Sequence, residues 1–573
     1  MDKVGLWVKK HWLAAIILAG TVVVFSWTLL TRPMFHTHDY LHGARIAEMT
    51  RGLLEGQWPV IWSENFGWGY GMPLFEFYAP LPYFLGALIH LLGVDLVWCT
   101  KILWLAVSVV TLWGSYKWAR EWFSIEVAAL SASMSALASY RAMDLFARGA
   151  MSELWAMAAL PWLLCGLTRL IRDEKHYQWY IVGGGVVLIL SHNITTMLAA
   201  PVLLLYIVAE VALERAAHLS VWDVVKRLAT WAVACLGLTA FYLLPALIEK
   251  ELTQVNTWIL GDYFNFRLHF VYFRQFWRDN FGYGGSGWGP DDGLSFFLGW
   301  AQWAGVAIGA GAMVASAKEW WHNRQKLHKV LLFTCFFAIF LFTLFMTMSK
   351  SQFIWEAAAD LLAFAQFPWR YLGISIILMA LVGAAGVAWF PKRWQTAIIV
   401  ALWLVLVGTS ASYFQGESYT GEDVHYTDEP EYIRQTLSGV LVDYLPIDFA
   451  NEWQEVPMAQ MVHEGNQPAV LVERMHEKLV QFEREASGEA EFNIAYYPGW
   501  RAEIDGEPAE IRVSERGNIV IDVPAGRHKV GVQLDSTPLR RVCNWVSAIS
   551  WLALAAWVLT GEKLGYNNAK RRD

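Results

Sequence analysis

The sequence predicts a polytopic α-helical membrane protein, with about 12 transmembrane helices and a β-rich domain outside the membrane near the C-terminus. Three observations predict this class. The 573-residue chain is 56% hydrophobic and only 17% charged, which is typical of proteins that cross a bilayer many times. Apolar stretches long enough to cross the hydrocarbon core recur along the chain. Its 33 Trp and 22 Tyr residues fit aromatic belts at the two membrane surfaces.

The first apolar stretch follows Lys9 and Lys10, and no small-residue cleavage site comes after it. We therefore expect a membrane anchor here rather than a cleaved signal peptide. The expected spans lie near residues 11–31, 96–117, 126–143, 152–170, 178–192, 194–213, 228–247, 295–316, 329–348, 369–390, 395–413 and 544–560. Residues 80–93 are too short to span and are expected to form a helix along the outer surface. The amphipathic pattern of residues 40–57 predicts another helix, which either lies in the interface or is buried.

Basic clusters set the expected orientation, because cytoplasmic loops are enriched in Lys and Arg. With both termini in the cytoplasm, every cluster falls on that side. The clusters are Lys3 to Lys10, Lys117 and Arg120, Arg169 to Lys175, Lys226 and Arg227, Lys318 to Lys329, Lys392 and Arg393, and Lys570 to Arg572. The outer side then holds residues 32–95, 141–153, 192–195, 248–295, 349–368 and 414–543.

Residues 414–543 are expected to form the outer domain, followed by the last span and a cytoplasmic tail at 544–573. Residues 414–540 contain 24 acidic and 10 basic residues, whereas the whole chain carries a net charge of −7. The outer domain is therefore acidic and the membrane body basic. Four β-type stretches separated by turn residues predict a small antiparallel β-sandwich. They are EAEFNIAYY, AEIRV, NIVIDV and HKVGVQL.

The loop that follows the first span places one acidic residue, Asp39, beside His36, His38 and His42. An ionisable residue at a membrane boundary is a functional candidate, and a carboxylate there can act as a general base toward a hydroxyl group. The alternative is a solvated loop carboxylate. His38 and His42 are four residues apart and can share a helix face as metal ligands. Without a HExxH pattern, hydrogen bonding or proton relay is the favoured role.

Other outer segments bring more polar side chains to the membrane boundary. RAMDLFARGAMSELWAMAALPW contains Asp144, Arg148 and Glu153, SHNITT contains His192, and AQFPWRYL contains Arg370. Arginine can hold a phosphate group by paired hydrogen bonds. Each arginine alone is also typical of an anchor that reaches the interface. Their collection on one side of the membrane indicates a shared site.

These segments together resemble the GT-C superfamily of membrane glycosyltransferases. The first loop carries HD, EGQWPVIW and GYGMPLFEFYAPLPYFLGAL, and the later blocks are RGAMSELWAMAALPW, SHNITTMLAAP and FPWRYL. The combination is most similar to the bacterial "6-pyruvoyl-tetrahydropterin synthase-related" membrane protein family. The YYPGWRAEIDGEP tail resembles the outer β-domain of related large membrane glycosyltransferases. The resemblance covers nearly the whole chain and implies a GT-C-like transmembrane domain over residues 1–413, with outer helices within residues 40–93.

The resemblance implies an inverting transfer of a sugar from a polyprenyl-phosphate donor to an acceptor outside the bacterial plasma membrane, in cell-envelope polysaccharide biosynthesis. The superfamily's catalytic acid falls on Asp39. Many members carry a second acid nearby, but the neighbour here is His38. Glu153, or else Asp144, would then take the second acidic role. A divalent metal ion is left open, and no cofactor is certain.

The expected site combines residues from several outer loops. We expect Asp39, Glu153 and His38 to form the catalytic group. We expect the donor phosphate to bind Arg370, Arg148 and His192. The candidates for contacts to the sugar or the acceptor are Trp68, Tyr70, Tyr78 and Trp500. Trp500 has the alternative role of a core residue, and the aromatic loop 248–295 either closes over the sugar or forms a static cap.

The expected partners are the lipid bilayer, the polyprenyl-phosphate-linked sugar and a cell-envelope glycan acceptor. No GxxxxGK[ST] segment is present, so neither a nucleotide-phosphate loop nor a nucleic-acid partner is expected. The five cysteines include no CxxC pair and fit packing roles. Two other functions compete with glycosyl transfer. A lipid or polysaccharide transporter needs a hydrophilic path through the spans, and in a non-catalytic envelope-assembly scaffold the outer polar residues would not converge.

Overall fold

The computed structural model describes residues 10–255, 262–321, 324–419, 422–439, 442–450, 455–457, 461–463 and 468–569. The predicted basic clusters at Lys3 and Lys9 and at Lys570 to Arg572, and residues 256–261 of the predicted cap, lie outside this set. The chain divides into two compact units. Unit 1 comprises the chain up to His42, Val97–Trp231 and Ile259–Tyr426, and unit 2 comprises Gly43–Leu96, Ala232–Trp258 and the chain from Thr427.

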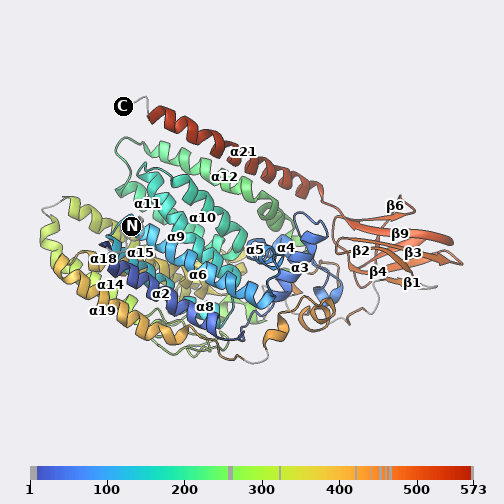
Figure 1. Cartoon of the computed structure of the whole chain (residues 1–573), viewed down its shortest axis with the longest axis horizontal. Coiled ribbons are helices and arrows are strands. Elements are labelled where there is room, and N and C mark those ends of the chain that lie inside the picture. The colour runs from blue at the N-terminus through green and yellow to red at the C-terminus, as the bar shows by residue number, and fades with distance from the viewer. Residues whose placement is uncertain are drawn as a thin grey trace. The chain divides into compact units, whose positions relative to one another are not determined.

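Within the described residues, nine helices are long and apolar enough to cross a membrane, which confirms a polytopic α-helical membrane protein (Figure 1). They are α2 (Trp12–Thr31), α6 (Leu96–Arg120), α9 (Met151–Ile171), α11 (Asn193–Leu213), α12 (Val221–Ile248), α15 (Arg324–Thr347), α18 (Leu372–Ala388), α19 (Lys392–Ser410) and α21 (Pro538–Ala569). The remaining predicted spans form α7 (Ile125–Ala136) with α8 (Ser139–Phe146), α10 (Tyr177–Ser191) and α14 (Trp300–Trp321).

The predicted span at 126–143 is interrupted, because the backbone at Ala138 is extended between α7 and α8. The break frees carbonyl groups at the end of α7, and buried side chains bind them. Gln302 donates to the Met134 carbonyl at 2.9 Å, and Arg141 donates to the Ala136 carbonyl at 3.3 Å. A buried helix end needs such partners, and they allow α8 to turn its own polar residues inward.

Helix α18 forms the centre of unit 1 and is buried over almost its whole length. It packs against α14 through facing glycines. A Cβ on Gly305 would lie 3.1 Å from the Cα of Gly383, and one on Gly309 would lie 3.3 Å from the Cα of Gly386. Small residues let membrane helices approach closely, so these glycines allow close contact between α14 and α18.

Unit 2 begins with the predicted outer helices, which form α3 (His42–Leu54), α4 (Leu74–Phe77) and α5 (Pro80–His90). The polar face of α3 is tied into an ionic network rather than exposed. Glu48 accepts hydrogen bonds from the backbone and side chain of Asn65 at 3.1 and 2.5 Å, and Arg51 pairs with Glu64 at 2.8 Å. Glu64 in turn binds Lys478 at 2.5 Å. The amphipathic pattern of this helix therefore serves buried pairing.

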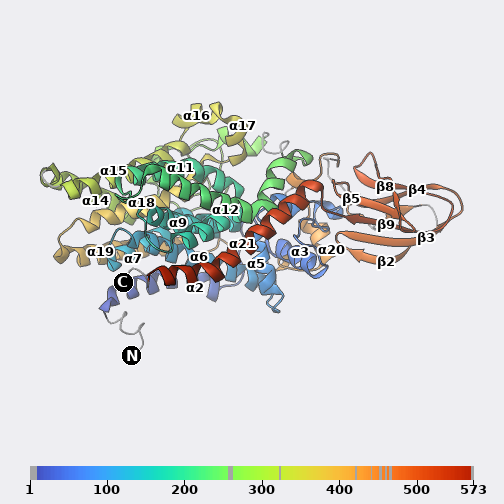
Figure 2. The same cartoon turned by 90° about the horizontal axis from the view of Figure 1, so that it is seen from above.

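The C-terminal part of unit 2 consists of two antiparallel sheets with the strand orders β1-β4-β8-β7 and β2-β3-β9-β5-β6. Figure 2 shows β2, β3, β9 and β5 side by side. The strands are β1 (Met461–His463), β2 (Ala469–Arg474), β3 (Glu477–Arg484), β4 (Gly488–Ala495), β5 (Trp500–Ile504), β6 (Glu507–Ala509), β7 (Arg512–Val513), β8 (Asn518–Val523) and β9 (Gly526–Leu534). EAEFNIAYY, NIVIDV and HKVGVQL lie in or overlap β4, β8 and β9, whereas AEIRV is divided between the end of β6 and β7, and β1, β2, β3 and β5 were not predicted.

Short helices occupy the connecting segments. They are η1 (Gly67–Gly69), η2 (Glu249–Leu252), η3 (Asp262–Phe264), η4 (Phe266–Leu268), η5 (Phe273–Phe276), η6 (Ser349–Ser351), α16 (Gln352–Ala357), α17 (Ala359–Leu362), η7 (Ala363–Ala365), η8 (Pro368–Tyr371), η9 (Ala411–Tyr413), η10 (Glu422–His425), α20 (Pro430–Tyr432), η11 (Ile433–Leu437) and η12 (Val442–Tyr444). Of these, η8 carries Arg370 and runs directly into α18.

Candidate functional site

A charged cluster lies in unit 1, where three helices begin. It comprises Asp144, Arg148, Glu153, His192 and Arg370, and we refer to it as the polar cluster. Glu153 is in the first turn of α9, His192 caps α11, and Arg370 is in η8 at the start of α18. Helix N-termini carry a partial positive charge and unpaired N–H groups. The two arginines balance the two acids, and the three helix N-termini add partial positive charge.

Arg148 connects the two acids of the polar cluster. Its guanidinium donates to Asp144 and, at 2.9 Å, to Oε2 of Glu153, and its Cζ lies 4.6 Å above the Trp369 ring. Tyr140 donates its hydroxyl to Oε1 of Glu153 at 2.8 Å. The side chains of Asp144 and Glu153 are only 0% and 2% exposed. Charges in such a dry place act strongly on one another.

The polar cluster also contains unused hydrogen-bonding capacity. Arg370 donates to the Ala365 carbonyl at 3.0 Å, while its Nε lies 3.5 Å from Oε2 of Glu153, too far for a strong bond. The buried Nε of Arg370 and Oδ2 of Asp144 make no hydrogen bond among the described residues. Burial raises the pKa of Asp144. The Glu153 carboxylate also raises this pKa, whereas the Arg148 guanidinium lowers it. Of the two coupled acids, Asp144 is thus the one that takes up a proton.

His192 joins the site through its role as the N-cap of α11. Its Nδ1 accepts hydrogen bonds from the Thr195 hydroxyl at 2.7 Å and the Thr195 amide at 3.3 Å. In a neutral ring that accepts at Nδ1, the proton is on Nε2. Its Nε2–H is then a further donor at the N-terminus of α11.

The segment that carries Asp39 is fixed to the turn between α8 and α9. His38 and Asp39 donate their backbone N–H groups to the carbonyls of Ala147 and Arg148 at 3.0 and 2.9 Å. His42 binds the Gly149 carbonyl at 2.6 Å. Gly149 has a positive φ of 66°, and a Cβ there would lie 2.9 Å from the Asp39 carbonyl oxygen. Because only glycine fits this turn, it holds the half-buried Asp39 next to Arg148.

His38 links the same segment to the aromatic loop. Its Nε2 donates to the Tyr283 carbonyl at 2.7 Å, which leaves Nδ1 as an acceptor in the neutral ring. Partial burial and nearby Arg148 lower the pKa of His38, although the bond to Tyr283 opposes this shift. His38 is therefore neutral near pH 7 and suited to accept a hydrogen bond from a hydroxyl group.

The aromatic loop is anchored beside the polar cluster by residues that the sequence analysis did not single out. Trp369 donates to the Ser286 hydroxyl at 3.1 Å, and His269 lies 3.0 Å from the same oxygen. His269 also binds the Tyr263 carbonyl at 2.5 Å and packs on Phe367. The glycine-rich GYGGSGWG stretch was the sequence feature that could have predicted a role for Ser286. Tyr140, which binds Glu153, lies directly before a quoted block and had no signal of its own.

The four predicted aromatic contact residues lie in unit 2. Trp68, Tyr70 and Trp500 are buried there, at 7%, 2% and 5% exposure. The Tyr70 hydroxyl accepts from Arg516 at 2.8 Å, the Tyr78 ring lies 4.4 Å from the guanidinium of Arg45, and Trp500 meets the Trp62 ring edge-on. All four thus have packing contacts within their own unit, and a role in binding sugar stays a prediction.

Metal ligation was the alternative reading of the histidines in the first loop. Nε2 of His38 lies against the Tyr283 carbonyl and Nε2 of His42 against the Gly149 carbonyl, so each has a hydrogen-bonding role. In the described part of the chain, no group of three or more His, Cys, Asp or Glu side chains has a metal-binding arrangement. Hydrogen bonding is therefore the observed role of His38 and His42.

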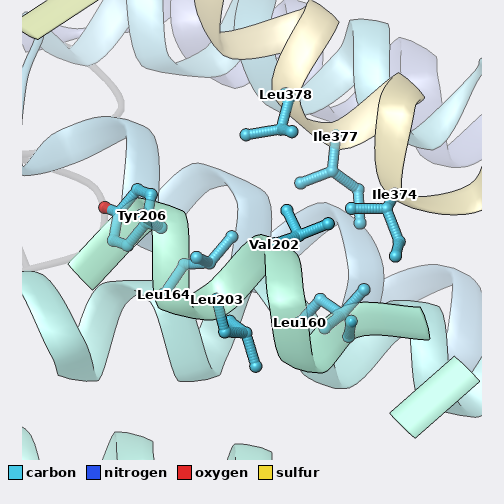
Figure 3. Close-up of a pocket in the computed structure, with 9 residues that line it drawn as sticks. Leu160, Leu164, Val202, Leu203, Tyr206, Ile374, Ile377 and Leu378 are labelled. Carbon is cyan, nitrogen blue, oxygen red and sulfur yellow. The ribbon is translucent and has the colours of Figure 1, made fainter. Parts of the chain in front are cut away.

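An apolar cavity of about 10 Å³ lies deeper between the same three helices. Figure 3 shows that α9, α11 and α18 line it with aliphatic side chains and the ring of Tyr206. The lining residues are Leu160, Leu164, Ala199, Val202, Leu203, Tyr206, Ile374, Ile377 and Leu378. Each helix therefore begins at the polar cluster and becomes fully apolar within a few turns.

The opposite end of α9 lies in a basic region, where three of the predicted cytoplasmic clusters meet. Arg169 and Arg172 bind Glu121 at 2.7 and 3.1 Å, and Arg227 binds Asp173 at 2.5 Å. Basic clusters that are far apart in sequence thus share one end of unit 1, and the polar cluster lies at the other end of α9. The assignment of the basic end to the cytoplasm stays a prediction.

No protein-family profile and no curated protein matches this sequence. Among solved structures, the chain is similar to the arabinofuranosyltransferase AftD from Mycobacteria, with 14% identity, a TM-score of 0.41 and coverage of 70% of this chain and 26% of that one. It is also similar to the oligosaccharyltransferase of Archaeoglobus fulgidus, with 11% identity, a TM-score of 0.38 and coverage of 72% and 57%. The chain thus spans less than two thirds of the length of either protein.

Proposed function

We propose that this chain is an integral-membrane glycosyltransferase of the GT-C type. It moves a sugar, with inversion, from a polyprenyl-phosphate donor to a cell-envelope glycan acceptor on the extracytoplasmic face of a bacterial plasma membrane. The observation that carries the proposal is the convergence, in unit 1, of the Asp39 segment with Arg148 and Arg370 at three helix N-termini. An acidic group thereby lies beside an anion-binding place at the end of apolar helices.

The donor phosphate is assigned to Arg370, Arg148 and the Nε2–H of His192. Arg370 has a buried Nε without a hydrogen bond among the described residues and contacts Glu153 only at 3.5 Å. An incoming phosphate diester supplies the missing acceptor. Guanidinium groups suit phosphate oxygens because they donate in a planar fork. Protonation of Asp144 compensates the added negative charge, since its pKa is already raised.

Asp39 is assigned as the general base. It takes the proton from an acceptor hydroxyl group as that oxygen bonds to the anomeric carbon of the sugar. The bond between this carbon and the phosphate oxygen breaks on the opposite face, which inverts the configuration. The electron pair leaves with polyprenyl phosphate, whose charge Arg370 and Arg148 stabilise. Neutral His38, through Nδ1, orients the acceptor hydroxyl, and Glu153 keeps Arg148 in place.

The apolar cavity lies a few turns from the polar cluster and is lined by aliphatic side chains, the kind of surface that an isoprenoid tail contacts (Figure 3). Its volume of about 10 Å³ holds no more than about one water molecule. The tail therefore requires α9, α11 and α18 to separate, or it lies against their lipid-facing sides near the cavity.

A transfer assay tests the proposal. The full chain in nanodiscs is supplied with radiolabelled polyprenyl-phosphate sugars and a cell-envelope extract as acceptor. We expect label transfer by the wild type and a loss of at least about a hundredfold in Asp39→Asn, the size of a general-base contribution. Asp95→Asn removes a carboxylate from the same predicted outer segment at an exposed position and serves as the matched control.

The outcomes of this assay are distinct. Asp39→Asn that still binds the labelled donor but no longer transfers it identifies the base. Full transfer by Asp39→Asn would remove Asp39 from that role. If the wild type binds no polyprenyl-phosphate sugar, the transferase proposal fails and the transporter and scaffold alternatives come forward.

A further inference from the structure

A second hollow on unit 1 lies on η5 and the residues that follow it. It has a volume of about 530 Å³ and is lined by Arg274, Trp277, Arg278 and Asp291. We refer to it as the Trp277 hollow. Small-ligand sites commonly have volumes of about 300–1,000 Å³, so the hollow has room for a sugar residue. No predicted site residue belongs to it.

The aromatic wall of the hollow is held rigidly from behind. The ring of Trp277 stacks on that of Trp303, with centroids 4.0 Å apart and planes 12° apart. Trp303 is fixed by its own indole N–H, which donates to the Phe276 carbonyl at 3.0 Å. The Trp277 side chain remains 37% exposed, although a large apolar side chain is usually buried more deeply. A flat, immobile indole is thus presented to the hollow at little entropic cost.

The polar wall of the hollow carries a net positive charge. Arg274 and Arg278, four residues apart, both bind the same Oδ1 atom of Asp291, at 3.2 and 2.8 Å. Two guanidinium groups therefore face one carboxylate, and each uses a single nitrogen on it. The neighbouring acids have other partners. Asp279 accepts from Trp300 at 3.3 Å, and Asp292 accepts from Gln275 at 2.7 Å.

We infer that the Trp277 hollow binds an acidic sugar residue of the glycan acceptor. A flat aromatic face packs on the apolar C–H side of a sugar ring, and a guanidinium fork recognises a carboxylate by paired hydrogen bonds. Asp291 can accept from sugar hydroxyl groups. The inference rests on the proposed function for the identity of the glycan as acceptor, but binding itself is measured without any transfer reaction.

An anionic lipid headgroup is the competing occupant, because Trp303 lies in the first turn of the apolar helix α14, where headgroups also gather. One feature favours the sugar. The exposed Trp277 ring offers an extended flat contact that a phosphate does not use, and on the same sugar Asp291 can accept hydrogen bonds from hydroxyl groups.

The test is a titration of the full chain in zwitterionic nanodiscs with a hexuronate tetrasaccharide, and in parallel with a neutral hexose tetrasaccharide, followed by calorimetry. We expect the wild type to bind the hexuronate and to prefer it over the neutral sugar. The double variant Arg274→Gln with Arg278→Gln should weaken hexuronate binding about tenfold or more, which is typical for lost hydrogen bonds to a charged group. Trp277→Ala should weaken binding of both sugars.

Controls separate binding from folding. Arg267→Gln removes a positive charge from the same loop at a residue paired with Glu356, outside the hollow, and should leave both affinities unchanged. Trp277→Phe keeps an aromatic ring on Trp303 and should bind better than Trp277→Ala. Binding of the polyprenyl-phosphate sugar should be unchanged in all these variants, so failure here is distinguishable from failure of the proposed function.

Several results would overturn the assignment. One is the absence of saccharide binding by the wild type. A second is equal hexuronate affinity in the wild type and the double arginine variant. A third is complete loss of hexuronate binding when the nanodiscs contain phosphatidylglycerol, because this would identify the hollow as a lipid headgroup site.

Discussion

Two buried ionic clusters, one in each unit, differ in their charge balance. In unit 2, Arg540 pairs with Glu76 at 3.1 Å and with Glu249 at 2.8 Å, and its guanidinium lies 4.6 Å from the Tyr497 ring. In this cluster one arginine forms ion pairs with two carboxylates. In unit 1, Arg148 and Arg370 face Asp144 and Glu153, and helix N-termini add positive charge. Both clusters contain buried atoms without a hydrogen bond among the described residues, but the unit 1 cluster has two arginines where the unit 2 cluster has one.

The elements that carry the unit 2 cluster indicate a structural role for it. Arg540 lies in the first turn of α21, Glu249 begins η2 directly after α12, Glu76 lies in α4, and Pro498 in the turn after β4 accepts from Arg540 at 3.0 Å. The unit 2 cluster therefore joins four elements of one unit. Burial and the neighbouring Glu249 carboxyl raise the pKa of Glu76 well above its ordinary value, although Arg540 opposes this. Buried charge alone thus does not indicate a ligand site, and a second arginine that can bind an added anion is the better criterion.

The largest expected effect, a loss of stability, comes from a substitution that disrupts the unit 2 cluster. Arg540→Ala leaves Glu76 and Glu249 buried without their cation and should cost about 3–5 kcal/mol of stability. Thermal unfolding in detergent measures this loss. Donor affinity of the folded fraction should not change. Arg512→Gln, which disrupts exposed pairs with Glu489 and Asp522, is the control and should cost at most about 1 kcal/mol. Equal destabilisation by both variants would contradict a buried, structural role for Arg540.

Arg370→Gln in unit 1 should strongly weaken donor binding and only slightly reduce stability. Its contact to Glu153 is long, at 3.5 Å, so the fold loses little. The bound phosphate loses a charge-assisted donor worth about 1.5–3 kcal/mol, which weakens donor binding by at least about tenfold. A filter-binding titration with labelled polyprenyl-phosphate sugar measures this change. Unchanged donor affinity combined with a large loss of stability would make Arg370 a structural residue like Arg540.

Gly149→Ala tests whether the turn positions Asp39. The added Cβ would lie 2.7 Å from the Thr37 hydroxyl and 2.9 Å from the Asp39 carbonyl, at a φ of 66°. Strain of about 1–3 kcal/mol should move the Asp39 segment. We expect a lower kcat for transfer with nearly unchanged donor affinity. Gly93→Ala, at a φ of 86° with nothing within 4 Å, carries only the backbone strain. The same kcat in both variants would contradict the positioning role.

A smaller effect concerns pH and Asp144. Burial raises its pKa, so below that value the acid is already neutral and the polar cluster has a net positive charge. Above it, anion binding must take up a proton, and donor affinity should fall by up to about tenfold per pH unit. The probe is a phosphodiester, whose own charge is constant over this range. Asp144→Asn should flatten the profile. A wild-type affinity that is constant between about pH 6 and 9 would contradict proton uptake.

Features that depend on local composition could be predicted before the structure was known. Hydropathy located α2, α9 and α18, because each span must be apolar over its own length. Alternation and turn residues located β4, β8 and β9. The same reasoning placed Asp39, Arg148, Glu153, His192 and Arg370 at the ends of spans, since charged residues interrupt apolar stretches there. The role of each remains a prediction, but their positions at the ends of elements followed from the sequence.

Which of these residues meet depends on contacts between distant parts of the chain. The break at Ala138 depends on Gln302, and the anchoring of the aromatic loop depends on Trp369 and Ser286. Arg540 meets Glu76 across more than 460 positions of the chain. Such contacts leave no periodic signal, because each partner fits its own element without the other. Gly149 is the clearest case, since its need for a positive φ follows from the Asp39 segment that packs against it.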